Sequence, residues 1–202
     1  ERLAPGFWRQ AILVGARIHP HHFRGDRPVC RRRDDGGILH RLRHGLRGEK
    51  LKKTDAGLIP NTWIVNLFGD AADFKNGINF SGDQKGEKGI PTIDVMNMYG
   101  MDIYVNYSKL NRVNKDISKD SDYILRKGDL LFVRSSLKPE GVGQVSLYRE
   151  NVEPTTFCGF IINARFKSPI FLPEFYVYYF RSDLGRSRFI GASRVSITNV
   201  NQ

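Results

Sequence analysis

A magnesium-dependent nuclease needs clustered carboxylates and a lysine, and one group of residues in this sequence offers those types. Asp73 is followed along the chain by Asp83 and Lys85. The latter two fall in residues 75–91, which are rich in Gly, Asn and Lys and indicate a polar loop. A loop lacks the rigidity that metal ligands need, so we interpret these charges as solvated. A nuclease is therefore the weakest of the functions that this sequence allows.

Histidine chemistry is confined to the start of the chain, because all 5 His lie within residues 1–50. His40 and His44 have a spacing that places two ligands on one face of a helix, and Ile38–Leu46 predicts a short helix there. No thiolate or carboxylate set completes a zinc site, and the nearby arginines would repel a cation, so we expect no metal. Residues 51–202 contain no histidine, which excludes Ser-His and Cys-His hydrolase arrangements from that part.

Nucleotide and methyl-transfer chemistry also lack their motifs. A phosphate-binding loop needs its glycines between a strand and a helix, whereas Gly141-Val142-Gly143 leads into a predicted strand. No Asn-Pro-Pro-Tyr-like motif is present to hold a flipped adenine, and no glycine-rich cofactor loop follows a first strand. We therefore expect a non-catalytic binding module that carries no cofactor of its own.

The charge balance points to a polyanionic partner. The chain has 202 residues, with 32 Lys+Arg against 21 Asp+Glu and a net charge of +11. Such a surplus is typical of proteins that bind nucleic acid. The 2 cysteines are too few for a disulfide framework, which favours a reducing compartment. No apolar run approaches a membrane span, so a cytoplasmic protein without a membrane partner is expected.

The composition divides the chain at residue 50. Residues 1–50 lack Ser, Thr, Asn and Tyr, and their charge is 12 − 5 = +7, against 20 − 16 = +4 for residues 51–202. Because small polar residues make turns and caps, residues 1–50 are interpreted as a basic arm rich in Arg and His, disordered or foreign. Residues 51–202 are predicted to form one domain.

That domain is expected to be α+β, mainly β, with one clear helix at its C-terminal end. Pro173 suits a first helical turn, and Leu172, Phe175, Tyr176, Tyr179 and Phe180 follow a helical stripe. Apolar runs predict strands at Trp63–Leu67, Ile93–Val95, Ile103–Val105, Leu130–Val133, Gln144–Tyr148 and Phe157–Ala164. Cys158 is interpreted as a buried thiol.

A series of short motifs runs through the same region. They are KTDAGLIPNTW at 53–63, LFGD at 67–70, Asn76-Gly77, LRKGDLL at 125–131 with Arg134-Ser135, GVG at 141–143, the helix from Pro173 to Arg186, and Gly191-Ala192 with Ile197-Thr198. In this order and spacing they resemble a target recognition domain in the specificity subunits of type I restriction–modification systems. LFGD is one residue longer than the family's Leu-Gly-Asp.

The resemblance implies a sequence-specific reader of double-stranded DNA that recognises one half of a split target and docks methyltransferase subunits. S-adenosylmethionine, ATP and magnesium would then belong to partner subunits, namely the methyltransferase and a motor nuclease. Family members carry a long helix after the domain, and this chain stops at Gln202 where the lead to that helix should begin. A single, truncated recognition domain is therefore expected.

Groove readers use polar and basic side chains on loops. The candidate DNA-binding residues are Lys75, Asn76, Asn79, Gln84, Lys85, Arg134, Ser135, Ser136, Lys138, Arg186, Arg188 and Arg194. Arg134 suits guanine and Lys138 suits phosphate, although Arg134 would instead support a turn if it paired with Asp129 or another carboxylate. The alternative to sequence-specific recognition is a non-specific nucleic-acid binder or an inactive remnant.

Overall fold

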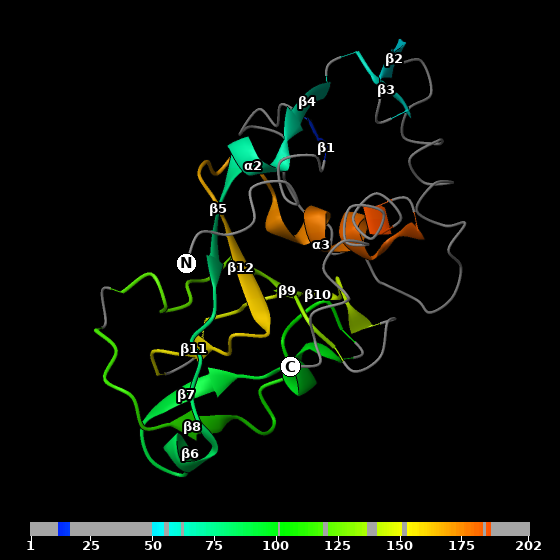
Figure 1. Cartoon of the computed structure of the whole chain (residues 1–202). Helices are drawn as coiled ribbons and strands as arrows, with labels where there is room; N and C mark the ends of the chain where they lie inside the picture. The colour runs from blue at the N-terminus through cyan, green and yellow to red at the C-terminus, as the bar shows by residue number, and fades with distance from the viewer. Residues whose placement is uncertain are drawn as a thin grey trace, which may run out of the picture. The chain divides into compact units, whose positions relative to one another are not determined.

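The computed structural model describes residues 12–16, 50–54, 57–61, 63–100, 102–118, 121–136, 141–150, 153–183 and 185–186 (Figure 1). They fall into two compact units, Ile12–Leu67 and a second unit whose described part begins at Phe68. The predicted helix at Ile38–Leu46, Cys30 and all histidines lie outside the described residues.

The first unit consists of two antiparallel strand pairs. β1 (Ile12–Ala16) pairs with β4 (Trp63–Leu67), and β2 (Leu51–Thr54) pairs with β3 (Gly57–Pro60). The predicted strand at Trp63–Leu67 is thus confirmed as β4. Its partner β1 belongs to the expected basic arm, so this unit crosses the boundary drawn at residue 50. The division of the chain at that residue stays a prediction.

The second unit contains two four-stranded sheets. The first has the order β10-β9-β12-β5, from Val145–Leu147, Leu130–Val133, Ile161–Phe166 and Ala72–Asn76. The second has the order β11-β7-β8-β6, from Thr156–Phe157, Ile90–Ile93, Asn111–Val113 and Lys85–Gly86. Short helical turns complete it: α2 (Phe68–Ala71), η1 (Gly82–Gln84) and η2 (Val95–Met98). Figure 1 shows β5 and β12 side by side, and they are antiparallel.

β9 is buried on both faces, which explains its uninterrupted apolar sequence. Leu131 and Val133 belong to a core cluster with Ile93 of β7 and Phe157 of β11. Phe132 faces the other way and meets the ring of Phe180, with centroids 5.2 Å apart. The first sheet therefore separates a mainly aliphatic core, which also holds Phe157 and Tyr148, from an aromatic one.

The aromatic core holds the C-terminal helix α3 (Pro173–Arg181), which confirms the prediction of one clear helix. Tyr176, Val177 and Phe180 are its buried residues, whereas Leu172 of the predicted stripe is 44% exposed. Arg181 anchors the end of the helix, because its guanidinium donates to the carbonyls of Val145 and Asp102. The mixed, mainly β fold class is thus confirmed.

Several predicted elements differ in detail. Lys75 and Asn76 lie in β5 rather than in a loop. The run Phe157–Ala164 is divided between β11 and β12 by a turn at 158–161, in which the Ile161 amide donates to the Cys158 carbonyl. Ile103–Val105 contributes one isolated bridge, between Tyr104 and Leu147, and no strand. Apolar patterning predicted burial there but could not locate the turns.

Candidate nucleic-acid interface

A groove of about 820 Å³ opens on the second unit where four segments meet. These are the end of β5 with the residues after it, residues 115–118 with 121–123, the residue that follows β9, and Gly159 in the turn between β11 and β12. Its lining is Phe74, Lys75, Asn76, Gly77, Ile78, Asn79, Lys115, Asp116, Ile117, Ser118, Ser121, Tyr123, Arg134 and Gly159. The groove is therefore polar, with aliphatic and aromatic side chains among its polar groups.

Three cations and one carboxylate line the groove, namely Lys75, Lys115, Arg134 and Asp116. The Lys75 ammonium lies 4.6 Å from the ring centroid of Tyr123, and Lys115 Nζ donates to the Asn79 carbonyl at 2.9 Å. Arg134 is exposed, and within the described part of the chain no ion pair or hydrogen bond joins its guanidinium. The surplus of positive charge suits an anionic ligand, and Arg134 keeps its donors available.

Asn76 is unusual among the groove residues because its Oδ1 is buried and has no hydrogen-bond donor among the described residues. A buried acceptor without a donor costs free energy, so packing alone does not account for an amide at this place. Asn79 lies on the same groove and is exposed. The exposed amide of Asn79 can recognise the edge of a base.

Close packing fixes the floor of the groove. A side chain at Gly77 would collide with the Cys158 carbonyl, and one at Gly159 would collide with Asn79 Oδ1. The Gly77 amide donates to the Ile161 carbonyl at 3.0 Å, and the Ile78 amide donates to the Phe157 carbonyl at 2.9 Å. Asn76 and Asn79 are thus held against the turn that joins β11 to β12.

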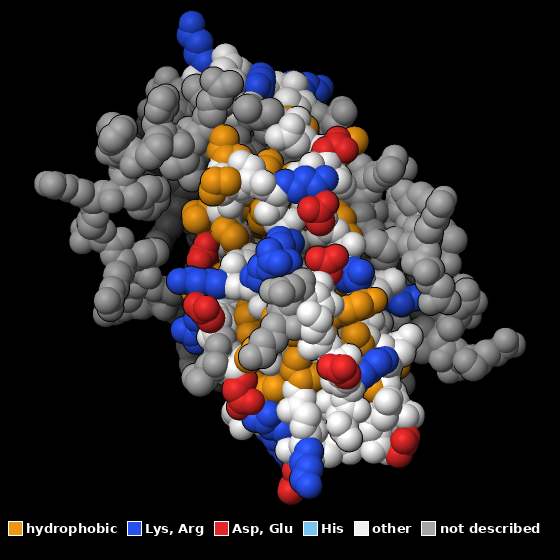
Figure 2. Space-filling view, turned by 90° about the vertical axis from the view of Figure 1, so that its left-hand side faces the viewer, with side chains coloured by type: hydrophobic (Ala, Val, Ile, Leu, Met, Phe, Trp, Pro, Cys, Tyr) orange, Lys and Arg blue, Asp and Glu red, His pale blue; other side chains and the backbone are white. Residues whose placement is uncertain are grey.

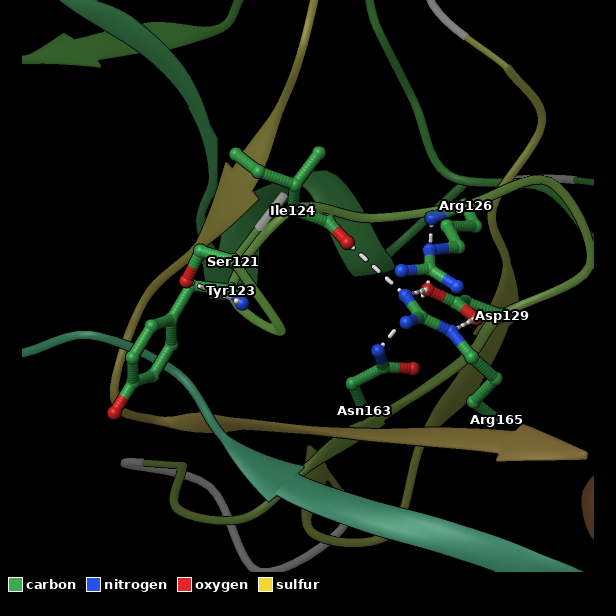
Figure 3. A network of polar contacts seen from close by, with 7 residues as sticks. All are labelled: Ser121, Tyr123, Ile124, Arg126, Asp129, Asn163 and Arg165. Atoms are coloured by element: carbon green, nitrogen blue, oxygen red, sulfur yellow. Dashed lines mark hydrogen bonds and ion pairs between the residues drawn. The ribbon is translucent and has the colours of Figure 1, made fainter. Parts of the chain in front are cut away.

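A buried ion pair holds the segment that carries Ser121 and Tyr123 (Figure 3). Asp129 is 1% exposed and accepts from Arg165 Nε and Nη2, at 2.8 and 2.7 Å. Asn163 Nδ2 and the Arg126 amide donate to the same carboxylate, at 3.0 and 2.8 Å. These contacts satisfy the buried charge, and the Asp129 carboxylate raises the pKa of the Arg165 guanidinium.

The same arginine reaches the chain next to Tyr123. Arg165 Nη2 donates to the Ile124 carbonyl at 3.0 Å, and the Leu125 amide donates to the Thr155 carbonyl at 2.9 Å. Figure 3 shows Tyr123 extending away from the ion pair. Its ring therefore projects from a backbone that is held on the other side, a good basis for positioning a recognition residue.

The structure brings together four of the twelve candidate residues, Lys75, Asn76, Asn79 and Arg134, because all of them line the groove. Asp129 pairs with Arg165, so the alternative that Arg134 pairs with Asp129 is wrong. Lys138, Arg188 and Arg194 lie outside the described residues. The remaining five candidates lie in the described residues but do not line the groove, namely Gln84, Lys85, Ser135, Ser136 and Arg186.

Four of those five contact other parts of the protein. Gln84 Oε1 accepts from the Ser81 amide, and Lys85 pairs with Asp94 at 2.7 Å. The Ser136 hydroxyl is 3.3 Å from that of Tyr99, and Arg186 donates to the Val142 carbonyl. Ser135 directly follows Arg134, and its amide donates to the Phe160 carbonyl at 3.4 Å. A role of these residues in DNA binding stays a prediction.

The residues considered for a nuclease have separate partners. Asp73 pairs with Lys167 at 3.4 Å, and Lys85 pairs with Asp94. Asp83 lies in η1, where the Ser81 hydroxyl lowers the pKa of its carboxyl group. Among the described residues, no group of three or more His, Cys, Asp and Glu side chains could hold a metal ion.

The part of the groove formed by residues 115–118 and 121–123 was not predicted from the sequence. Lys115, Ser118, Ser121 and Tyr123 come from a run, residues 114–123, with the sequence NKDISKDSDY. Its density of Lys, Ser and Asp was a usable signal, because such residues fill loops. Their proximity to Asn76 and Arg134 depends on the tertiary fold.

Figure 2 shows one face of the molecule, on which Lys and Arg side chains lie among Asp and Glu, with hydrophobic side chains between them. The described cations on this face do not form one continuous patch. The groove is therefore a better marker of a binding surface than the overall charge. No helix within the described ranges is long and apolar enough to cross a membrane.

No family model and no curated protein matches the sequence. Among solved structures, the chain is similar to the HsdS subunit of Thermoanaerobacter tengcongensis, with 13% identity and a TM-score of 0.49 over 82% of this chain and 41% of that one. It is also similar to a chain from a study of complex assembly and conformational transition in a type I restriction–modification system, with 14% identity and a TM-score of 0.45 over 75% and 40%.

A third structure is the S subunit of a type I restriction–modification system from M. genitalium, with 14% identity and a TM-score of 0.38 over 82% of this chain and 34% of that one. This chain thus spans less than half the length of each of the three. The second and third of these structures come from type I restriction–modification systems.

Proposed function

We propose that the chain is a non-catalytic module that recognises a sequence in double-stranded DNA, as part of a specificity subunit of a type I restriction–modification system. The observation that carries this proposal is the groove, which combines Lys75, Lys115 and Arg134 with the amides of Asn76 and Asn79. Cations position a protein on the phosphates, while amide and guanidinium groups distinguish base edges.

Within such a system the chain would recognise one half of a split target and dock methyltransferase subunits. It would hold no cofactor itself, and S-adenosylmethionine, ATP and magnesium would act on the methyltransferase and the motor nuclease. The order of motifs from residue 53 to residue 198 supports this assignment.

Selection of duplexes from a random pool by the full chain tests sequence recognition directly. We expect one short sequence to be enriched, and the enriched duplex to bind more tightly than a scrambled one at every salt concentration. Enrichment of no sequence, with affinity that depends on salt alone, would contradict the proposal and favour the non-specific binder. Incubation with DNA, magnesium and labelled S-adenosylmethionine should give neither cleavage nor methylation.

Two substitutions separate the roles of the groove cations. Arg134→Ala should weaken the selected duplex by about 1–3 kcal/mol and relax the sequence choice at one position, if Arg134 contacts a base edge. Lys115→Ala should weaken all duplexes alike and reduce the salt slope by about one, if Lys115 contacts a phosphate. Arg126→Ala and Lys127→Ala are matched controls, because both residues are exposed and neither lines the groove.

A further inference from the structure

Phe160 is a large apolar side chain in an exposed position, with 60% of its surface accessible. Within the described part of the chain no aromatic ring packs against it. Single exposed apolar residues are common on proteins and need no special explanation. The position of Phe160 beside the groove is what separates it from the others.

The turn that carries Phe160 is fixed from both sides. The Phe160 carbonyl accepts from the Arg134 amide at 2.8 Å and from the Ser135 amide at 3.4 Å. Ile161 closes the turn onto Cys158, with an N···O distance of 2.9 Å. Gly159 packs against the Asn79 side chain, which would have to move if a larger residue replaced the glycine. The ring is therefore presented by a rigid backbone.

The neighbours of Phe160 place it at the rim of the groove. Gly159, which precedes Phe160, lines the groove. Arg134 also lines it, and the Arg134 amide donates a hydrogen bond to the Phe160 carbonyl. A cationic groove with aromatic rings along it suits a nucleic acid whose bases are accessible for stacking. Two aromatic residues, Phe74 and Tyr123, line the groove itself.

We propose that Phe160 stacks on a base at a step where the bound duplex is locally unstacked, so that the ligand is double-stranded DNA kinked or unpaired beside the groove. Proteins that insert an apolar wedge between base steps kink the duplex there. The inference rests on the proposed function, since it assumes that DNA occupies the groove.

Other exposed apolar side chains lie elsewhere. Met96 is 79% exposed and Tyr178 is 41% exposed, but neither they nor their neighbours along the chain line the groove. Arg134 can hold a phosphate or a base edge next to the inserted ring. An exposed aromatic residue hydrogen-bonded through its backbone to a groove arginine therefore fits an opened DNA step better than an intact one.

The test compares a fully paired duplex with the same duplex carrying one central unpaired base, using anisotropy competition with the full chain. Unstacking costs a few kcal/mol in the paired duplex, and the unpaired base removes part of that cost in advance. We expect the bulged duplex to bind more tightly, by about fivefold or more, the ratio that the lower end of base–aromatic stacking energies gives.

Phe160→Ala should abolish this preference, whereas Phe160→Trp should retain it and Tyr178→Ala should not change it. Thermal melts confirm that each variant is folded. A wild-type chain that binds the paired duplex without preferring the bulge, or a preference that survives in Phe160→Ala, would overturn the inference and leave the proposed function intact.

Two further outcomes are distinguishable. If Phe160→Ala keeps the bulge preference but loses binding to a purified methyltransferase subunit, the exposed ring belongs to a protein contact and the inference is overturned. If the wild-type chain binds neither duplex, the proposed function fails together with the inference. Loss of preference in Phe160→Ala through weaker binding to the bulged duplex would support stacking.

Discussion

Replacement of Arg165 by alanine should destabilise the second unit strongly, because it leaves the Asp129 carboxylate buried without its counter-charge. Asp129 is 1% exposed and Arg165 provides two of the four hydrogen bonds that it accepts, at 2.8 and 2.7 Å. Arg165 also donates to the Ile124 carbonyl, so the variant loosens the segment that carries Tyr123.

The magnitude follows from the burial of the pair. Removing one partner of a buried ion pair costs about 3–5 kcal/mol, because the remaining charge cannot return to water. Two lost hydrogen bonds to a charged group give a sum of about the same size. Since small domains are stable by about 5–15 kcal/mol, the loss is a large share of the total.

Urea unfolding followed by circular dichroism measures the loss directly. Arg165→Lys should cost less than Arg165→Ala, because the lysine keeps the charge but not the forked geometry. Arg112→Ala is the matched control: Arg112 pairs with Glu153 at 2.6 Å on the surface, where the two side chains are 33% and 51% exposed. Solvent screens that pair, so its loss should be small.

Equal losses for Arg165→Ala and Arg112→Ala would refute the reasoning, because the Asp129 carboxylate would then be hydrated in the folded protein. A loss below about 1 kcal/mol for Arg165→Ala would refute it as well, since that value is typical of exposed pairs.

Three more outcomes are expected. Gly77→Ala should lower stability by about 1–3 kcal/mol or more, because its Cβ would meet the Cys158 carbonyl. Gly82→Ala is the control, because the space around Gly82 is open. Equal urea midpoints for the two variants would contradict this. Burial raises the pKa of the Cys158 thiol to about 12. Its contribution to stability is therefore complete below the ordinary thiol pKa of about 8.5 and is lost as the pH rises toward the folded value. In a Cys30→Ser variant, a thiol reagent at neutral pH should label Cys158 only after urea is added, and rapid native labelling would contradict its burial. A chain that begins at Leu51 should keep the unfolding transition of the second unit, because the core cluster lies between Ile93 and Ile161; a melting point lower by more than about 10 °C would contradict this.

The sequence by itself determined the elements whose local signals were strong. The stripe around Tyr176 and Phe180 with Pro173 at its start specified α3, and the continuous apolar run Leu130–Val133 specified a strand buried on both faces. Local periodicity and capping are properties of short segments, so no tertiary information was needed. The basic composition and the motifs likewise indicated a DNA-binding module.

Tertiary structure alone decided which polar residues act together. Arg134 shares a groove with Lys75 because β12 lies between β9 and β5 in one sheet, and Lys115 joins them from the segment that follows β8 of the other sheet. No local signal specifies such strand order. The same holds for Asp129, whose partner is Arg165 on β12 rather than nearby Arg134. The sequence predicted Lys85 to be a solvated loop cation, whereas in the fold its ammonium lies 2.7 Å from the Asp94 carboxylate. Contacts between segments distant in sequence depend on register and burial, and these emerge only when the whole core is packed.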